Sequence, residues 1–340
     1  MTDIQTNSVR KVIENSVCLV TGAGGTIGSQ LCRQIIDYSP KKLILLDICE
    51  NGVYELQQEI FFKHGMHVPV TIEIASVRDR DKMEIIFERY LPDIVFHTAA
   101  HKHVPLMEHC AEEAVKNNVA PTLNLAETSI KYNVKRFILI STDKAVNPLS
   151  VMGATKRCCE MIMKYFASQG GCSFITVRMG NVLGSSGSVA VLFKKQIESG
   201  GPVTVTHPDV SRYFITIPQS AWLILKAAAN ADSGQIYIPK MDKPVKILDL
   251  AETMIRDSGF QPYKDIDIKF TGLREGEKLH EQLFQSSEYT ELCQDNSVYI
   301  GQLPQVPKNF MRDLKSLIQL AQRNDSLAVV NLLHDLVSEK

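Results

Sequence analysis

The sequence predicts an α/β fold in which helices cover both faces of a doubly wound parallel sheet and a smaller lobe follows toward the C-terminus. Three observations favour this fold. Short apolar runs alternate with helix-length segments, a glycine-rich turn follows the first run, and glycine, serine and proline become frequent after Arg178, through Gly201-Pro202. With 340 residues, 44% of them hydrophobic, the chain is long enough for one large domain and an appended smaller one.

The first half of the chain alternates predicted strands with predicted helices. Apolar runs typical of buried strands lie at Val17–Val20, Leu43–Leu46, Val68–Ile74, Ile94–Thr98 and Phe137–Thr142. Helical spacing or composition marks Ser29–Tyr38, Val53–Lys63 and Asp79–Tyr90, and it returns in the tail at Met311–Val337. We expect right-handed crossovers between parallel strands, with the tail packed on the outside.

Charge and cysteine content exclude several classes of protein. A formal net charge of −1 gives no field that would attract nucleic acid or an anionic membrane. The eight cysteines include no C-x-x-C pair, and the adjacent Cys158 and Cys159 cannot easily bridge, so we expect reduced thiols and no metal site. The segment Met1–Asn15 has no apolar core, and no apolar run reaches the roughly 18 residues of a membrane span. We therefore expect a soluble, cytoplasmic protein that needs no membrane contact.

The glycine-rich turn predicts a binding site for a dinucleotide. It follows the first apolar run and opens a helix, so its glycines allow close approach of a pyrophosphate while the helix N-terminus favours negative charge. Glycines that merely form a turn are the alternative, and the strand and helix context argues against it. The residues assigned to the pyrophosphate are Gly22, Gly25, Thr26, Ile27 and Gly28.

Asp47, at the end of the second predicted strand, indicates which dinucleotide is bound. A carboxylate about 20 residues after the glycine turn accepts hydrogen bonds from ribose hydroxyls and repels a ribose 2′-phosphate, so NAD is predicted over NADP. The ends of the third and fourth strands complete the predicted cofactor site with Ser76, Val77, Ala99 and Ala100. An ordinary strand end accounts for Ser76 and Val77 equally well.

The end of the fifth predicted strand carries the candidate catalytic residues. Ser141 is followed by Thr142, Asp143 and Lys144, at the sheet edge where such folds bind ligands. This arrangement is similar to the active site of the short-chain dehydrogenase/reductase (SDR) superfamily, in which a Tyr-x-x-x-Lys lies on the next helix. Here the lysine is Lys156 and Met152 replaces the tyrosine. A thioether cannot take up a proton, so acid–base chemistry is assigned to Asp143 and Lys144.

Six motifs in order resemble those of the UDP-N-acetylglucosamine 4,6-dehydratases, which are extended SDR enzymes of bacterial polysaccharide and glycoprotein sugar synthesis. The motifs are Thr21–Gly28, Ala99–Glu108, Ser141–Pro148, Met152–Lys156, Arg178–Gly184 and Leu273–Glu281. The resemblance extends from about Asn15 to about Gln285, and Met152 is similar to the branch that retains configuration at C5. Many members of that branch carry membrane helices before the catalytic part, so this chain is either a naturally soluble member or an excised catalytic portion.

The resemblance implies how the chain is organised. Residues 1–180 are expected to form mainly a Rossmann-type NAD-binding domain of the extended SDR kind. Residues 181–340 are expected to form mainly a lobe that binds a nucleotide sugar, with some strands and helices returning to the Rossmann domain. It further implies a UDP-sugar substrate and a homo-oligomer.

The resemblance also implies a reaction and roles for the residues at the strand end. A 4,6-dehydratase oxidises C4 by hydride transfer to NAD, removes the C5 proton, expels the C6 hydroxyl and returns the hydride to C6. Lys144 is then the base at C5, with a pKa lowered by Lys156 and by desolvation. Asp143 is the acid for the C6 hydroxyl, and Thr142 orients the C4 oxygen. Which group removes the C4 hydroxyl proton stays open.

The nucleotide end of the substrate requires cations and a ribose contact. Arg212 and Arg274 are assigned to the diphosphate, which an arginine can bind through two parallel hydrogen bonds. By resemblance, Asn181 contacts the substrate and Glu277 the uridine ribose, while Lys102 is close enough in the chain to the fourth strand to reach the sugar. A strand-edge charge for Arg212 and a helix cap for Glu277 are the structural alternatives.

Two other functions are compatible with parts of this pattern. An NAD-dependent nucleotide-sugar epimerase needs only reversible C4 oxidation, but it has no use for Asp143 and Lys144 and usually depends on the absent tyrosine. A non-catalytic NAD-binding sensor would tolerate loss of the tyrosine, yet Lys156, Asp143, Lys144 and the Arg274 motif are all present.

Overall fold

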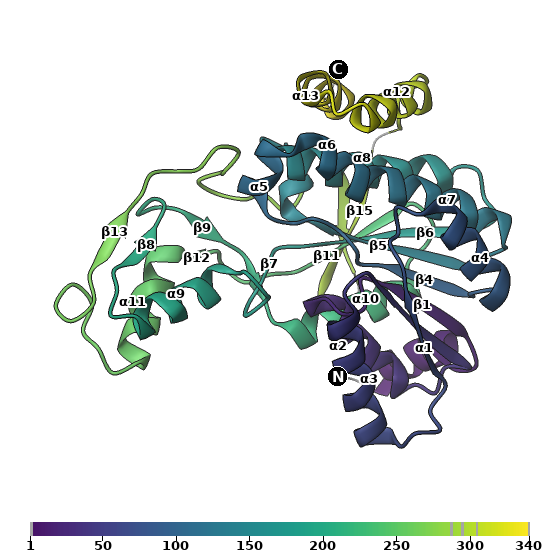
Figure 1. Cartoon of the computed structure of the whole chain (residues 1–340), viewed down its shortest axis with the longest axis horizontal. Coiled ribbons are helices and arrows are strands. Elements are labelled where there is room, and N and C mark those ends of the chain that lie inside the picture. Colours follow the sequence, from purple (N-terminus) through teal and green to yellow (C-terminus); the bar gives the residue numbers. More distant parts are fainter. Residues whose placement is uncertain (1–2, 286–287, 294–295, 304, 339–340) are drawn as a thin grey trace.

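A nine-stranded, mainly parallel sheet forms the centre of the computed structural model, which describes residues 3–285, 288–293, 296–303 and 305–338 (Figure 1). The strand order is β14-β15-β11-β6-β5-β4-β1-β2-β3. The strands are β1 Val17–Thr21, β2 Lys42–Asp47, β3 Val70–Ile74, β4 Ile94–His97, β5 Arg136–Thr142, β6 Ser173–Met179, β11 Gln235–Pro239, β14 Tyr289–Leu292 and β15 Val298–Gln302. All neighbours from β3 to β11 are parallel, whereas β15 runs antiparallel to both of its neighbours.

Helices cover both faces of this sheet, so the predicted doubly wound α/β fold is confirmed (Figure 1). One face carries α1 Asp3–Ile13, α2 Thr26–Ile36, α3 Glu50–His64 and α10 Ile217–Asn230. The other carries α4 Arg80–Tyr90, α5 Val104–His109, α6 Ala111–Ala114, the π-helix Val115–Val119, α7 Ala120–Lys131 and α8 Val151–Ala167. Each face has its own apolar core because the central strands are buried on both sides.

The C-terminal tail forms α12 Phe310–Gln322 and α13 Ser326–Val337, which pack outside α6 and α8 (Figure 1). Burial of Leu314, Leu317 and Leu333 against the α8 side of the core holds them there. The predicted helical tail on the outside is therefore confirmed. In the described part of the chain, no helix combines the length and apolarity required to cross a membrane.

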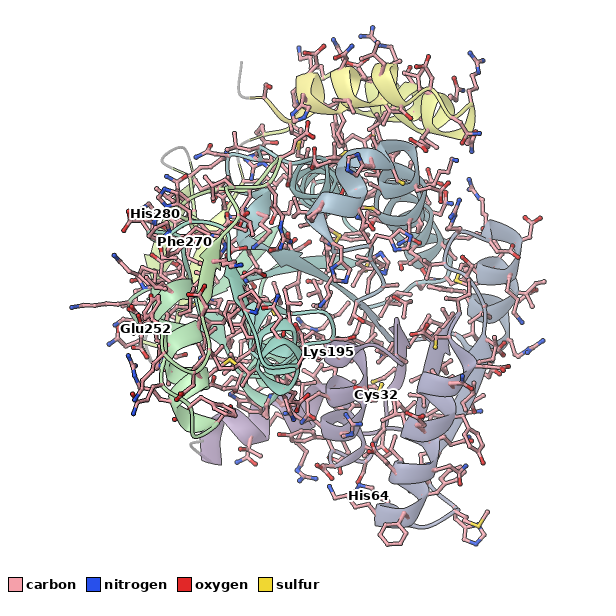
Figure 2. The ribbon with its side chains drawn as sticks, turned by 60° about the vertical axis from the view of Figure 1, so that its left-hand side comes forward. Cys32, His64, Lys195, Glu252, Phe270 and His280 are labelled. Carbon is pink, nitrogen blue, oxygen red and sulfur yellow. The ribbon has the colours of Figure 1, made fainter. Side chains whose placement is uncertain are left out.

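A smaller lobe projects from one side of the sheet (Figure 1). It contains α9 Val189–Glu198, α11 Ile247–Asp257 and three short strand pairs: β7 Asn181–Val182 with β10 Phe214–Ile215, β8 Val203–Val205 with β13 Ile268–Phe270, and β9 Ser211–Arg212 with β12 Val245–Lys246. A separate core that includes Phe193, Val203 and Ile255 stabilises it. Figure 2 shows Lys195, Glu252, Phe270 and His280 on the lobe side, and Cys32 and His64 on the α2 and α3 side.

Candidate active site

A cleft of about 950 Å³ runs along the carboxyl ends of the parallel strands and on to the lobe. Its volume lies at the upper end of the range for cofactor and ligand pockets. Every residue predicted for the site lines this cleft except Asp143. The fold therefore brings these predicted residues to one cleft, including five that are far from the glycine turn in the chain: Lys102, Asn181, Arg212, Arg274 and Glu277.

The glycine turn between β1 and α2 has the backbone conformation that a pyrophosphate site requires. Gly22 has φ +71°, and a Cβ there would lie 2.7 Å from the Ala99 nitrogen. At Gly28 a Cβ would lie 2.1 Å from the Gly22 carbonyl oxygen, so only glycine allows α2 to start this close to β1. The N-cap of α2, Gly25, offers no side chain that would occupy the helix N-terminus. These residues fit a dinucleotide.

Asp47 lies at the end of β2, on the cleft side of the glycine turn. Its carboxylate accepts hydrogen bonds from the backbone nitrogens of Gly24 and Cys49, both at 2.9 Å, which fix its position. Ala99 and Ala100, after β4, lie on the opposite side of the turn and leave room for a ligand because their side chains are small.

Three consecutive residues after β5 form one hydrogen-bonded group. The Thr142 hydroxyl donates to Asp143 Oδ1 at 2.9 Å, and Lys144 Nζ donates to the same oxygen at 3.0 Å. Lys144 Nζ also donates to Asn181 Oδ1 at 3.0 Å, which links the strand end to the lobe. A 3₁₀ turn over Asp143–Ala145 produces this arrangement directly after the strand.

Asp143 is fully buried and does not line the cleft, which corrects the expectation that it acts on the substrate directly. It lies behind Thr142 and Lys144, and its Oδ2 has no hydrogen-bond partner among the described residues. A proton can therefore pass between Asp143 and the cleft through the Thr142 hydroxyl or the Lys144 ammonium group.

The expectation that Lys144 has a lowered pKa is also wrong. Burial by itself would lower the pKa of Lys144, but the carboxylates of Asp143 and Glu281 more than compensate and raise it above its usual value. Glu281 Oε1 lies 3.4 Å from Lys144 Nζ. Lys144 is therefore an ammonium group in the free protein.

Helix α8 places Met152 and Lys156 in the cleft one turn apart. The Ser150 hydroxyl caps this helix by accepting from the Gly153 nitrogen at 3.0 Å. A Cβ at Gly153 would lie 2.3 Å from the Lys144 carbonyl oxygen, so glycine allows the helix to start against the strand end. Met152 is only 3% exposed, and burial lowers the pKa of Lys156.

The substrate-side cations lie where the lobe meets the strand ends. Arg212 is buried and donates to Glu277 Oε1 at 3.1 Å and to the Ser211 carbonyl oxygen at 2.8 Å. Arg274 is exposed in the cleft and has its backbone nitrogen bonded to the Glu277 carboxylate at 3.2 Å. Arg212 and Glu277 thus form an ion pair within the site, which sequence reasoning did not predict.

Residues 184–188, which we call the strap, line the cleft and contact the glycine turn. The Ser186 nitrogen donates to Thr26 Oγ1 at 3.2 Å, and Lys102 Nζ donates to the Ser186 carbonyl oxygen at 2.7 Å. Gly187 packs against the imidazole of His103, where a Cβ would come within 2.6 Å of Cε1. Lys102 therefore contacts the strap.

Glu281 lies in the site although it was not predicted from the sequence. Its carboxylate lines the cleft, its side chain is 3% exposed, and it lies among Lys144, Arg212 and Lys278. The only signal was its place at the end of the last of the six motifs, which says nothing about its proximity to Lys144.

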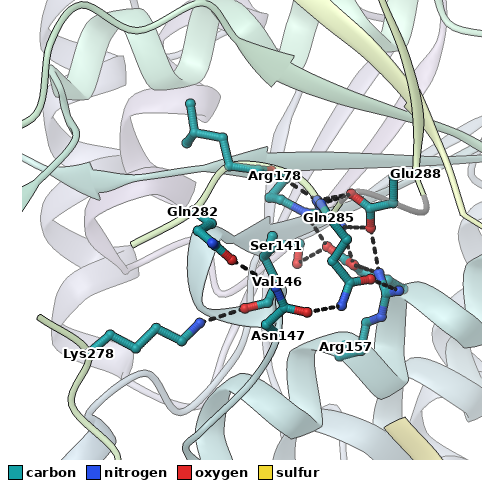
Figure 3. A network of polar contacts seen from close by, with 11 residues as sticks. Ser141, Val146, Asn147, Arg157, Arg178, Lys278, Gln282, Gln285 and Glu288 are labelled. Atoms are coloured by element: carbon teal, nitrogen blue, oxygen red, sulfur yellow. Dashed lines mark hydrogen bonds and ion pairs between the residues drawn. The ribbon is translucent and has the colours of Figure 1, made fainter. Parts of the chain in front are cut away.

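A buried group of four charges supports the strand end (Figure 3). Arg178 of β6 is fully buried and pairs with Glu160 of α8 and with Glu288, each at 2.7 Å. Arg157 also pairs with Glu288 at 2.7 Å, and the Ser141 hydroxyl donates to Glu160 at 2.7 Å. The charges balance, so β5, α8, β6 and the segment before β14 are joined without an unpaired buried charge.

Neither metal ligation nor a disulfide contributes to the site as described. Within the described ranges, no three His, Cys, Asp or Glu side chains are grouped so that they could hold a metal ion. None of the eight cysteines, all of which lie in the described residues, forms a disulfide, and Cys158 and Cys159 are buried on α8.

Comparison with known proteins assigns the chain to a family. A family described as polysaccharide biosynthesis protein matches residues 18–302. The chain belongs to this family. It is 44% identical over 339 residues to the probable polysaccharide biosynthesis protein EpsC of Bacillus subtilis, a match that covers 98% of this chain and 56% of EpsC. The chain thus spans little more than half the length of that family member.

Relatives of this chain with lower sequence identity carry more specific names. A UDP-N-acetylglucosamine 4,6-dehydratase (inverting) of Campylobacter jejuni is 31% identical over 275 residues, covering 79% of this chain and 78% of the relative. A UDP-glucose 4-epimerase of Rickettsia rickettsii is 31% identical over 276 residues, with the same two coverages. The X-ray structure of Pen from Bacillus thuringiensis superposes with a TM-score of 0.78 at 31% identity, over 86% of this chain and 91% of Pen.

Proposed function

We propose that this chain catalyses the NAD-dependent dehydration of UDP-N-acetylglucosamine to a UDP-2-acetamido-2,6-dideoxy-4-keto-hexose for glycan synthesis. One observation carries the proposal: the hydrogen-bonded group Thr142–Asp143–Lys144 adjoins a dinucleotide-sized cleft in which Met152 replaces a proton-accepting phenol. Elimination of water needs an acid and a base beside the sugar, and this group supplies both. The similarity to a dehydratase of the same substrate supports the assignment.

The residues that would hold NAD are those of the glycine turn, Asp47, the ends of β3 and β4, and Lys156. Gly22, Gly25, Thr26, Ile27 and Gly28 would surround the pyrophosphate, Ser76 and Val77 the adenine, and Ala99 and Ala100 the opposite side of the cleft. The Asp47 carboxylate would accept from the ribose hydroxyls and disfavour NADP. When bound, NAD supplies reversible acceptance of a hydride from C4 and its return to C6.

The C4 hydroxyl proton would leave through the hydroxyl of Thr142. Thr142 Oγ1 donates to Asp143 Oδ1 at 2.9 Å, so a proton accepted by the threonine oxygen can be passed on to the buried carboxylate. The Asp143 carboxylate would then hold this proton away from the cleft. This route needs no proton acceptor at Met152, which only packs beside the sugar.

Lys144 would act first as an acid, because it is an ammonium group in the free protein. It gives its proton to the departing C6 oxygen and takes the C5 proton in exchange, so water leaves and the charge on Lys144 is unchanged. When the hydride reaches C6, Lys144 returns the proton to C5. Asp143 then passes the stored proton to Lys144 across their 3.0 Å contact, which restores both groups.

The nucleotide would lie toward the lobe. Arg212 and Arg274 would bind the diphosphate, which must compete with Glu277 for the Arg212 guanidinium. Glu277, once released, would be available to the uridine ribose, and Asn181 and Lys102 would contact the sugar. Because this chain has methionine at position 152, it resembles the methionine-bearing branch of the family, and we propose that it retains the configuration at C5.

The test is to incubate the protein with UDP-N-acetylglucosamine and NAD and to identify the product by mass spectrometry and NMR. Loss of one water with formation of a C6 methyl group is the expected result. An isobaric product would replace the proposal with epimerisation, which the equally similar Rickettsia epimerase makes the second candidate. Binding of NAD without turnover would instead indicate a sensor.

A further inference from the structure

Glu281 is the carboxylate that lines the cleft beside Lys144, whereas Asp143 lies behind it. Glu281 Oε1 is 3.4 Å from Lys144 Nζ and 3.9 Å from Arg212 Nε, and Oε2 is 3.6 Å from Lys278 Nζ. Oε2 is buried and has no hydrogen-bond partner among the described residues. One buried carboxylate is therefore paired with three cations, each at a distance longer than that of an ideal hydrogen bond.

The segment that carries Glu281 is held against the loop after β5 on both sides of this residue. Lys278 Nζ donates to the Val146 carbonyl oxygen, and Asn147 Nδ2 donates to Gln282 Oε1 at 2.7 Å (Figure 3). Gln285 Nε2 donates to Asn147 Oδ1 at 2.8 Å. Because Val146 and Asn147 follow Lys144 closely in the chain, these bonds fix Glu281 relative to the Lys144 ammonium group.

We propose that Glu281 is a positioning residue that fixes the Lys144 ammonium group in the cleft and holds its proton there. The inference rests on the proposed function only for its catalytic meaning, since the contact between the two side chains is independent of any substrate. Glu281, which is more than 130 residues from Lys144 in the sequence, would thus control the protonation of a residue at the end of β5.

Among the described residues, Asp143, Glu281, Arg212 and Lys278 face Lys144, and they act on its protonation in opposite directions. Asp143 and Glu281 favour the ammonium form, while Arg212 and Lys278 oppose it. Asp143 is tied to Thr142 and would receive the C4 proton during turnover, so its charge is lost when that proton arrives. Glu281 is then the carboxylate that still holds Lys144 protonated for delivery to the C6 oxygen.

The experiment measures the Lys144 pKa directly by NMR on protein labelled with ¹³C at the lysine ε-carbons. The Lys144→Arg variant identifies the Lys144 signal by its loss. In the wild type we expect this signal to keep its protonated shift to the highest pH at which the protein stays folded. In Glu281→Gln, which preserves the shape of the side chain, the Lys144 signal should titrate within that pH range, with a midpoint about one pH unit or more below the upper limit of the range, and Glu281→Asp should restore the protonated form partly.

Glu277→Gln is the matched control, because Glu277 pairs with the same Arg212 but not with Lys144. It should weaken substrate binding without lowering the Lys144 midpoint. A Lys144 signal in Glu281→Gln that keeps its protonated shift over the same pH range as in the wild type would overturn the proposal, as would an equal fall of the Lys144 midpoint in Glu277→Gln.

The rate assay separates this inference from the proposed function. If the wild type dehydrates the substrate, the high-pH limb of kcat should move to lower pH in Glu281→Gln while KM changes less than kcat. If the wild type shows no dehydration, the proposed function fails, and the NMR titration still decides the role of Glu281.

Discussion

At the scale of single residues, the site depends on which groups carry protons before a substrate arrives. Lys144 is an ammonium group because Asp143 and Glu281 lie within 3.4 Å of it, and Asp143 is shielded from the cleft. Neither property is visible in the motif Thr142–Lys144, since one depends on a residue far along the chain and the other on a 3₁₀ turn. The residue types were predictable, but their protonation was not.

Lys144→Ala should abolish exchange of the C5 proton with solvent deuterium and lower kcat by roughly 10²–10⁴-fold. The reason is that no other cation of the strand-end group can give up and take back a proton beside C5. NMR of the recovered substrate and product in deuterated water measures the exchange. Lys135→Ala, which removes an exposed lysine paired with Asp93, is the control and should exchange normally. Undiminished exchange in Lys144→Ala would refute its role.

His97 makes a separate prediction about stability and pH. Burial, reinforced by the charge of Lys156, lowers the pKa of His97 from 6.5 to about 3, and its ring lies between the hydroxyls of Thr21 and Thr122. The unfolded chain takes up a proton below pH 6.5 that the folded protein excludes. The free energy of unfolding should therefore fall by up to about 1.4 kcal/mol per pH unit as the pH drops from 6.5 toward 3.

Urea unfolding of the wild type and of His97→Asn between pH 6.5 and about 4.5 checks this contribution. The variant is less stable overall, but its stability should decline less steeply with falling pH. Parallel slopes in the two proteins would show that His97 is not the group responsible.

At the scale of elements, the order of strands and helices was predictable because each apolar run is bounded by polar or glycine-rich segments. The run Val17–Val20 became β1 and Asp79–Tyr90 became α4 with Asp79 as its N-cap. Sequence could not place β14 and β15, because they join the sheet only after the chain has left the lobe. For the same reason it could not place Glu281.

The strap, residues 184–188, should slow the release of bound NAD, because Ser186 bonds to both Lys102 and Thr26 at the edge of the proposed cofactor site. Gly187→Ala forces a Cβ against the His103 ring and should speed NAD dissociation roughly tenfold, as expected for a loss of about 1.4 kcal/mol. Gly184→Ala is matched, since Gly184 also has positive φ but a Cβ there meets nothing within 4 Å. Stopped-flow displacement measures the rate of NAD dissociation from each of the two variants. Equal rates would show that the strap does not retain NAD.

The four buried charges that join β5, α8 and β6 should contribute to the stability of the fold. Arg178→Met leaves Glu160 and Glu288 buried with less compensation and should lower the free energy of unfolding by about 3–5 kcal/mol. Arg256→Ala breaks an exposed pair with Glu252 on α11 and should cost about 0.3–0.5 kcal/mol. Urea denaturation measures the free energy of unfolding of both variants. Similar decreases in the two would mean that the four buried charges do not stabilise the strand end.

At the level of the whole molecule, the cleft is assembled from segments that are spread along the chain between Gly22 and Glu281. The glycine turn and Asp47 come from the first strands, Thr142 to Lys156 from the middle, and Glu277 and Glu281 from the segment that leaves the lobe. The part of the cleft that we propose holds NAD could be predicted because its strand, turn and helix are contiguous in sequence. The part proposed to hold the substrate rested on the motif resemblance, since its residues meet only through the fold.

In the reaction that we propose, one hydride held by the cofactor moves from C4 to C6 of the same sugar while water is lost. The most direct measurement uses UDP-N-acetylglucosamine carrying deuterium at C4, incubated with the protein and NAD, with the product analysed by NMR. We predict that the deuterium appears in the C6 methyl group of a 4-keto product. Deuterium that remains at C4 in a sugar that has kept its C6 hydroxyl would contradict the proposed hydride transfer.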